Sequence, residues 1–334
     1  MKKISIVTPI YNSFHQMKRN LRILENYPME GIELIIVDDC SKDDSYEQAI
    51  SYSENVTFPI KILKNQTNSG PGVSRNKGIE DASGDYITFV DSDDYLSEDF
   101  YEQMCPLMEQ GIDCIIFDYQ FVSDSGEKLG YGHSVDSNIL QHGLLEQNSA
   151  FVYTFGSTVG KLYKRKILTQ YNVQFGEFYR NEDMPFTKIA LARCDSIYYL
   201  PKQLYNYVQL ESSLMHNSAL NDERNCQRAF ELVSEQLRDA GLEEELIAVE
   251  LREVLNNSVQ IMIGRGCTNR EIIDFISKHY KIGHLKNRYV KKYPVYVRMM
   301  GWLAYFHCIF PIRLMWRIKN GSRKKDVELY YSCL

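Results

Sequence analysis

The sequence lacks the cysteine patterns and the leader segment that mark zinc-binding and secreted proteins. Its eight cysteines are scattered, and none belongs to a Cys-x-x-Cys pair. Neither a zinc site nor a disulfide framework is therefore indicated. No apolar signal segment follows the first methionine, because Met1-Lys2-Lys3 leads directly into a short apolar run. We expect a protein of the reducing cytoplasm.

Positive charge is not in excess either. The chain has 38 lysine and arginine residues against 44 aspartate and glutamate residues, a formal net charge of -6, which argues against nucleic acid as a partner. No Gly-x-Gly-x-x-Gly follows the first predicted strand, so dinucleotide binding is not expected. A length of 334 residues, with 44% hydrophobic and 25% charged residues, is typical of a soluble protein with two domains or one large domain with an appendage.

Apolar strands alternate with amphipathic helices from the start of the chain to about residue 120. The expected strands cover residues 4–9, 32–37, 60–63, 86–90 and 112–119, and the expected helices cover 13–26, 43–53, 70–82 and 98–110. This order predicts right-handed crossovers and an α/β fold, with a mostly parallel sheet and helices flanking it on both faces. Ligands of such sheets bind beyond the carboxyl ends of the strands.

Acidic side chains follow the strand at 86–90. Asp91, Asp93 and Asp94 repel one another and lose solvation if they are packed together, so a cation would neutralise them. On an extended chain Asp91 and Asp93 point to the same side, which suits Mg2+ or Mn2+ shared with substrate phosphates. A solvated acidic turn before the next helix is the alternative. Tyr11-Asn12 and Asp38-Asp39 follow two other strands, which predicts one polar crevice.

The alternation ends near residue 120. Residues 123–149 read as loops or a short hairpin, 184–192 as a helix, and 196–200 and 205–208 as short strands. Helical patterns then cover 226–240, 242–264 and 270–278. We therefore expect a first domain over residues 1–215 and a helical C-terminal region over 216–334.

The segment 295–318 is apolar and aromatic, but three arginines and a proline interrupt it. A membrane span needs about 20 apolar residues, so we do not expect one. Basic residues flank the segment, and two interpretations stay open: peripheral contact of 286–325 with the cytoplasmic face of the inner membrane, or a buried helix that packs on the first domain.

Four segments together resemble a family 2 glycosyltransferase with the Rossmann-like GT-A fold, of the kind found in bacterial polysaccharide biosynthesis. They are residues 4–12 (ISIVTPIYN), 36–43 (IVDDCSKD), 68–78 (NSGPGVSRNKG) and 84–94 (GDYITFVDSDD). The resemblance covers about the first 215 residues. It implies an inverting transfer of a sugar from a nucleoside-diphosphate sugar, preferably a UDP-sugar, to a hydroxyl of a polysaccharide or lipid-linked oligosaccharide precursor, with Mn2+ or Mg2+ as cofactor.

The same resemblance assigns the nucleotide-binding residues. Pro9 and Tyr11 would lie against the base, and Asp39 would accept a hydrogen bond from uracil N3–H. Arg75 would approach the diphosphate or ribose. Asp91 would bind the ribose, or the metal through water. From the residues alone, Asp38 and Asp39 can equally be helix-capping acids and Arg75 a surface residue of a helix.

The remaining assignments concern the metal, the base and the substrate. Asp93 would bind the metal, with Asp91. In the Glu182-Asp183 pair, Asp183 would be the general base that an inverting transfer requires; the alternative is two acids at a helix start. Further candidates for contacts with donor or acceptor are Asn76, Asp94, Lys161, Glu182 and His216.

Two other functions are compatible with part of this pattern. A sugar-phosphate nucleotidyltransferase also places acids at strand ends, but it carries a glycine-rich first turn, whereas Pro9-Ile10-Tyr11-Asn12-Ser13 contains no glycine. A non-catalytic nucleotide-sugar-binding module is disfavoured because both Asp93 and Asp183 are present.

Overall fold

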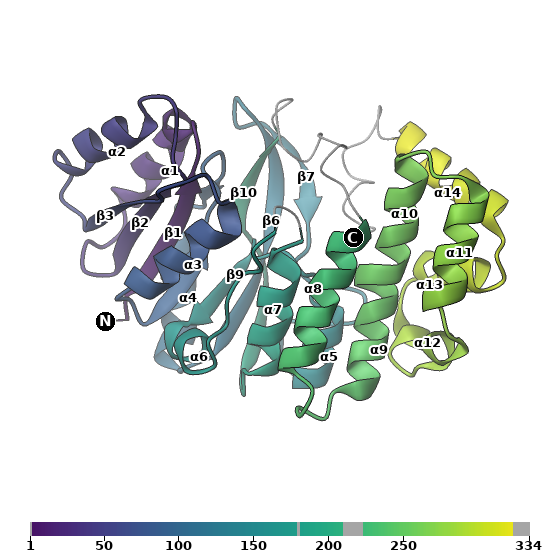
Figure 1. Cartoon of the computed structure of the whole chain (residues 1–334). Helices are drawn as coiled ribbons and strands as arrows, with labels where there is room; N and C mark the ends of the chain where they lie inside the picture. Colours follow the sequence, from purple (N-terminus) through teal and green to yellow (C-terminus); the bar gives the residue numbers. More distant parts are fainter. Residues whose placement is uncertain (1, 179–180, 210–222, 323–334) are drawn as a thin grey trace.

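A computed structural model describes residues 2–178, 181–209 and 223–322. One ten-stranded sheet occupies the first part of the chain, and a group of helices follows it (Figure 1). The strands are β1 (Ile4–Ile10), β2 (Ile32–Asp38), β3 (Ile60–Lys64), β4 (Tyr86–Phe89), β5 (Tyr95–Leu96), β6 (Cys114–Ser123), β7 (Lys128–Gly132), β8 (Gly143–Leu145), β9 (Lys161–Lys164) and β10 (Ile197–Gln209).

The order of strands along the sheet is β3-β2-β1-β4-β9-β6-β10-β5, with β7 paired to β6 and β8 paired to β10. The longest ladders are parallel: β1 pairs with β2 and β4, β2 with β3, and β6 with β10. Shorter antiparallel ladders join β9 to β4 and β6. The expected mostly parallel sheet is confirmed, and it is mixed at its centre and at one edge.

The two short strands expected at 196–200 and 205–208 are one strand. β10 pairs with β6 on both sides of Pro201, and the register shifts between Leu200 and Tyr205. Proline has no backbone N–H to donate to a ladder. A single strand that is interrupted by Pro201 therefore gives the sequence pattern of two separate strands.

Helices cover both faces of the sheet, as predicted. Before residue 200 they are the 3-10 helix η1 (Phe14–Met17), α1 (Lys18–Leu24), α2 (Ser45–Ser53), α3 (Pro71–Asp81), α4 (Phe100–Glu109), α5 (Gln147–Tyr153), α6 (Arg165–Gln170) and α7 (Asp183–Ala192). One face packs against Met17, Leu21 and Met104 of η1, α1 and α4. The other face packs against Ile79 of α3 and Phe186 of α7.

The C-terminal region is helical, as expected. Its elements are α8 (Glu223–Gln236), α9 (Glu243–Val249), the π-helix η4 (Glu250–Asn256), α10 (Asn257–Gly264), α11 (Asn269–His279), α12 (Ile282–Lys286), the 3-10 helix η5 (Val290–Lys292), α13 (Val295–Tyr305) and α14 (Ile309–Ser322). The apolar segment expected at 295–318 is therefore two helices. His307, with a φ of 56°, turns the chain between them.

One hydrophobic cluster crosses the predicted boundary at residue 215. It runs from Val7 in β1 through Phe186 in α7 and Val233 in α8 to Ile312 in α14. α13 contributes a buried face to this cluster, so the expectation of a buried helix is confirmed for that face. Its main contacts are with α11, α12, η4 and α14 rather than with the first domain. No helix in the described part of the chain is long and apolar enough to span a membrane.

Gly78 gives a test of this packing. A Cβ built at this helical position would lie 2.3 Å from Cγ1 of the buried Val7. We expect Gly78→Ala to lower the free energy of unfolding by about 1–3 kcal/mol, because overpacking forces backbone shifts. Urea denaturation measures the change. The control is Gly283→Ala in α12, where nothing lies within 4 Å of the added carbon; equal losses in the two variants would contradict the packing argument.

Candidate active site

The ends of three parallel strands bring the predicted nucleotide-binding residues to one edge of the sheet. Ile10 is opposite Asp38 in the β1–β2 ladder, and Val7 is opposite Phe89 in the β1–β4 ladder. Tyr11, Asp39 and Asp91 therefore follow strands that are neighbours in the sheet and run toward the same edge. Tyr11 is 43% exposed, so its ring is accessible from solvent.

Asp39 holds the loop that precedes α3. Its carboxylate accepts hydrogen bonds from the backbone N–H groups of Ser69 at 2.9 Å and Gly70 at 2.7 Å, and from the side-chain amide of Asn65 at 2.8 Å. Gly70 has a φ of 92°, a conformation that glycine adopts without strain. The predicted contact of Asp39 with uracil stays a prediction. The sequence did not reveal this second role, because the loop is about 30 residues away in the chain.

Arg75 joins three carboxylates from two distant parts of the chain. Its guanidinium donates to Asp91 at 2.7 Å, to Glu182 at 3.1 Å and to Asp183 at 3.2 Å. The arginine side chain is only 5% exposed, and it lies over the ring of Phe175. The acid after β4 and the Glu-Asp pair at the start of α7 are thus parts of one ionic cluster.

Asp183 is the first residue of α7, as the position of Pro185 predicts. Its Oδ2 accepts from the hydroxyl of Thr158 at 3.3 Å and from the Thr158 backbone N–H at 3.4 Å. Burial raises the pKa of Asp183 above its usual value, although the charge of Arg75 opposes the rise. Burial, and then the charge of Asp183, raise the pKa of Glu182 to about 7.

The acids after β4 lie in a turn, so the extended geometry expected for Asp91 and Asp93 is wrong. The backbone N–H of Asp94 donates to the carbonyl of Asp91 at 3.1 Å. Asp94 is buried, and its carboxylate accepts from the hydroxyl of Tyr205 at 2.6 Å and from the N–H of Val208 at 2.8 Å. These bonds explain the turn, because they direct Asp94 into the fold and attach it to β10.

Asp91 and Asp93 fit a divalent cation that also binds a substrate phosphate. Burial and the charge of Asp91 raise the pKa of Asp93 to about 6. Among the residues that the structure describes, no lysine, arginine or histidine forms an ion pair with Asp93. Residues 2–178, 181–209 and 223–322 contain no group of three or more His, Cys, Asp or Glu residues arranged to hold a metal. Mg2+ is usually bound through one or two carboxylates, with phosphates and waters as its other ligands.

Two buried lysines hold the segment that carries Thr158. Lys161 donates through Nζ to the carbonyls of Ser157 and Val159. Lys188 donates to the carbonyls of Phe151 and Thr154. Both lysines are fully buried, so Lys161 supports the loop from behind, and its predicted contact with a substrate stays a prediction. The sequence analysis missed Lys188, although a lysine in the mostly apolar stretch 184–192 was a signal.

Three predicted site residues remain to be placed: Asn76, Pro9 and His216. Asn76 forms two hydrogen bonds with the backbone of Phe175, at 3.1 Å and 2.8 Å, and so places the ring under Arg75. Pro9 lies in β1, one residue before its end. His216 lies outside the described residues.

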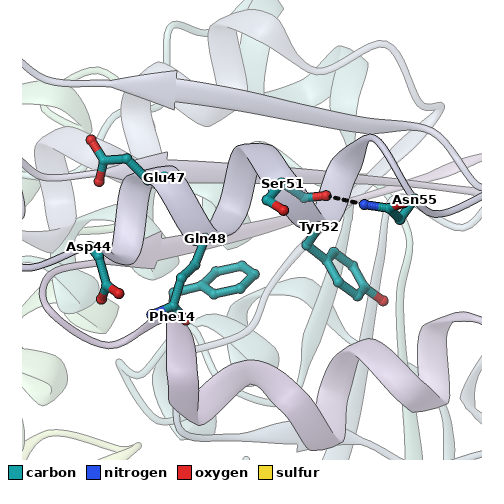
Figure 2. A pocket seen from close by; sticks show the side chains of 7 residues that line it. All are labelled: Phe14, Asp44, Glu47, Gln48, Ser51, Tyr52 and Asn55. Atoms are coloured by element: carbon teal, nitrogen blue, oxygen red, sulfur yellow. Dashed lines mark hydrogen bonds between the residues drawn. The ribbon is translucent and has the colours of Figure 1, made fainter.

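A surface hollow exists elsewhere on the molecule. Figure 2 shows its lining by side chains from η1 and from α2 with its flanking residues: Phe14, Asp44, Glu47, Gln48, Ser51, Tyr52 and Asn55. None of the predicted site residues is among them. The candidate site is therefore identified by its charges and contacts rather than by this hollow.

Known structures share this fold. Staphylococcus aureus TarS 1-349 in complex with UDP-GlcNAc superposes with a TM-score of 0.70 at 22% sequence identity, over 96% of this chain and 92% of that one. The mannosyltransferase PcManGT from Pyrobaculum calidifontis, in complex with GDP-Man and Mn2+, has a TM-score of 0.53 at 14% identity, over 91% and 87% of the two chains. The expected GT-A fold with a helical C-terminal region is confirmed.

The profile of glycosyl transferase family 2 matches residues 5–171, and the chain belongs to this family. It is 32% identical over 213 residues to "Putative glycosyltransferase EpsH" of Bacillus subtilis, which is 61% of this chain and 60% of EpsH. It is 27% identical over 264 residues to the poly(ribitol-phosphate) beta-N-acetylglucosaminyltransferase TarS of Staphylococcus aureus, which is 77% of this chain and 44% of TarS. The chain thus spans about half the length of these curated relatives.

Removal of the positive charge at Arg75 should destabilise the fold in a pH-dependent way. Arg75→Met leaves Asp91, Glu182 and Asp183 without their shared cation, and we expect a loss of about 3 kcal/mol at neutral pH. The three carboxyls would then have raised pKa values in the folded state, so the folded variant gains stability as the pH falls and protons bind. Urea denaturation at several pH values measures this.

The control for this variant is Arg22→Met, at an exposed position of α1. It should change the free energy of unfolding little at any pH. A loss for Arg75→Met that stays constant down to acidic pH would mean that packing over Phe175, and not charge, is what the arginine supplies.

Proposed function

We propose that the protein is an inverting glycosyltransferase that moves a sugar from a UDP-sugar to a hydroxyl of a polysaccharide or lipid-linked oligosaccharide precursor. The observation that carries the proposal is the Arg75 cluster. It holds the donor-side Asp91 next to Asp183, a carboxylate with a raised pKa at the start of a helix. Membership of glycosyl transferase family 2 supports the reaction class.

The donor would bind at the ends of β1, β2 and β4. Tyr11 and Pro9 offer a surface for the base, and Asp39 an acceptor for uracil N3–H. A solved relative carries UDP-GlcNAc, which supports a uridine nucleotide. Asp91 and Asp93 would hold Mg2+ or Mn2+, and a bound ion of this kind supplies neutralisation of the charge that develops on the leaving diphosphate.

The transfer is a single displacement. The acceptor hydroxyl gives its proton to a carboxylate oxygen of Asp183, and the hydroxyl oxygen bonds to the anomeric carbon. The bond from that carbon to the diphosphate oxygen breaks, and the nucleoside diphosphate leaves on the opposite face, which inverts the configuration. Thr158 and Arg75 orient the Asp183 carboxylate, and the buried setting keeps it more basic than an exposed aspartate.

The acceptor is proposed by analogy with the relatives. The name of TarS states transfer to poly(ribitol-phosphate), and a Bacillus spizizenii relative with 27% identity is named poly(ribitol-phosphate) beta-glucosyltransferase. We therefore propose a polymer or lipid-linked precursor of the bacterial cell envelope, reached from the cytoplasmic face of the inner membrane. A panel of nucleotide sugars with Mn2+, read as release of nucleoside diphosphate, tests the donor.

Asp183→Asn should remove the base and keep the shape of the site. We expect turnover to fall by roughly 10²–10⁴-fold, with near-normal UDP binding, because the proposed nucleotide contacts lie on other residues. In the wild type, activity should disappear as the pH falls and Asp183 gains a proton, and its raised pKa moves this loss to higher pH than for an exposed aspartate.

Asp44→Asn, at the exposed start of α2, is the control for the loss of an acid next to a helix N-terminus. Proton NMR of the anomeric signal in the product gives the stereochemistry. A product that retains the donor configuration would exclude a single displacement and leave Asp183 without the proposed role.

The metal proposal has a test that does not depend on turnover. Asp93→Asn replaces a carboxylate whose ionised form is disfavoured in the fold. Without metal the variant should therefore melt above the wild type at pH 7.5, and the difference should vanish as the pH falls well below about 6. UDP with Mn2+ should raise the melting temperature of the wild type but not of the variant. A variant that keeps the metal-dependent shift would remove Asp93 from the metal site.

A further inference from the structure

α13 exposes a row of large apolar side chains. Val295, Met299, Trp302 and Phe306 are spaced by four, three and four residues, which places them on one face of the helix, and all are exposed. Trp302 and Phe306 stack on each other there, with ring centroids 5.8 Å apart. Contiguous exposed apolar patches on a folded domain mark sites of interaction with proteins, membranes or ligands.

The neighbouring helix α14 also exposes large apolar side chains. Phe310 is 76% exposed and Leu314 is also exposed, one turn apart on this helix. The opposite faces are anchored, because Val297, Ala304 and Ile312 are buried in the main hydrophobic cluster. The exposed face therefore belongs to helices that are fixed to the molecule, and these helices lie at the end of the molecule opposite β2 and β3 (Figure 1).

The stretch of chain that forms these two helices and leads into them carries charge of one sign. Residues 281–322 contain nine lysine or arginine residues and no aspartate or glutamate, in a chain whose formal net charge is -6. Lys286, Lys291 and Lys292 are exposed before α13, and Arg317 is exposed on α14. Arg288 is exposed as well, but it already forms an ion pair with Glu244 of the same chain, at 2.7 Å.

We propose that the exposed face of α13 and α14 docks on an anionic lipid surface. Trp302, Phe306 and Phe310 would enter the headgroup region, and Lys291 and Lys292 would lie at the lipid phosphates. Helices with an apolar aromatic face and basic flanks bind membranes in this way, parallel to the surface. A second copy of the chain is a poorer occupant, because two faces of the same positive charge would repel each other.

This proposal does not depend on the proposed transfer reaction, because lipid binding needs neither donor nor acceptor. The probe is the full-length protein with vesicles of phosphatidylcholine, with or without phosphatidylglycerol, in a flotation assay. We expect binding to the phosphatidylglycerol vesicles only, and weaker binding at high salt. Both tryptophans of the chain, Trp302 and Trp316, lie in this segment, so a blue shift of tryptophan emission reports insertion directly.

Paired variants separate the apolar and electrostatic contributions. Phe306→Ser with Phe310→Ser should abolish the blue shift and most of the binding, whereas Tyr131→Ser with Leu144→Ser, at equally exposed positions of β7 and β8, should change neither. Lys291→Glu with Lys292→Glu should weaken binding by about tenfold or more. Its control is Lys128→Glu with Lys166→Glu, at exposed lysines outside the segment.

UDP binding and thermal melting of each variant show that it is folded. Equal binding to vesicles without phosphatidylglycerol, or unchanged binding of the phenylalanine variant, would overturn the proposal. So would a wild type that ignores vesicles but self-associates through this face, seen as a dimer that the phenylalanine variant converts to a monomer in analytical ultracentrifugation. Failure of these tests leaves the nucleotide-release assay unaffected, so it is distinguishable from failure of the transfer proposal.

Discussion

The buried charge of Arg75 is the constraint on which the candidate site depends. Asp91 follows β4, whereas Glu182 and Asp183 stand at the start of α7, far from it in the chain, and without a common cation their repulsion would oppose the packing of these elements. The arginine lies in α3, whose start is held by the Asp39 carboxylate. The turn after β4, the start of α7 and helix α3 are thereby connected through one side chain.

Much of the fold could be predicted from the alternation of apolar strands and helices, because that pattern depends on local burial. The polar residues at the ends of β1, β2 and β4 were found for the same reason. The turn at Asp91–Asp94 was not, since it forms through bonds from Tyr205 and Val208 of a strand more than 100 residues later. Thr158 also escaped prediction, because only its tertiary contact with Asp183 distinguishes it from other threonines.

The C-terminal helices show why a sequence pattern can support two opposite interpretations. A segment that is rich in apolar residues around its whole circumference suits both a core helix and an interfacial helix. In α13, Val297 and Ala304 are buried while Trp302 and Phe306 are exposed. The description of a core helix holds for the buried face, whereas the exposed face is the one for which we propose contact with a membrane. One hydrophobic cluster contains residues of these helices together with residues of α7 and β1.

The segment 151–159, whose carbonyls accept hydrogen bonds from Lys161 and Lys188, has a consequence for molecular recognition. Lys161 and Lys188 fix four carbonyls between residues 151 and 159, so this segment is ordered before any molecule meets Thr158 and Asp183. A rigid segment lowers the entropic cost of association, because little backbone freedom remains to be lost. The segment also adapts little to the shape of a bound molecule. A change in the preferred partner of this site would therefore have to come from exposed side chains around it rather than from movement of the backbone.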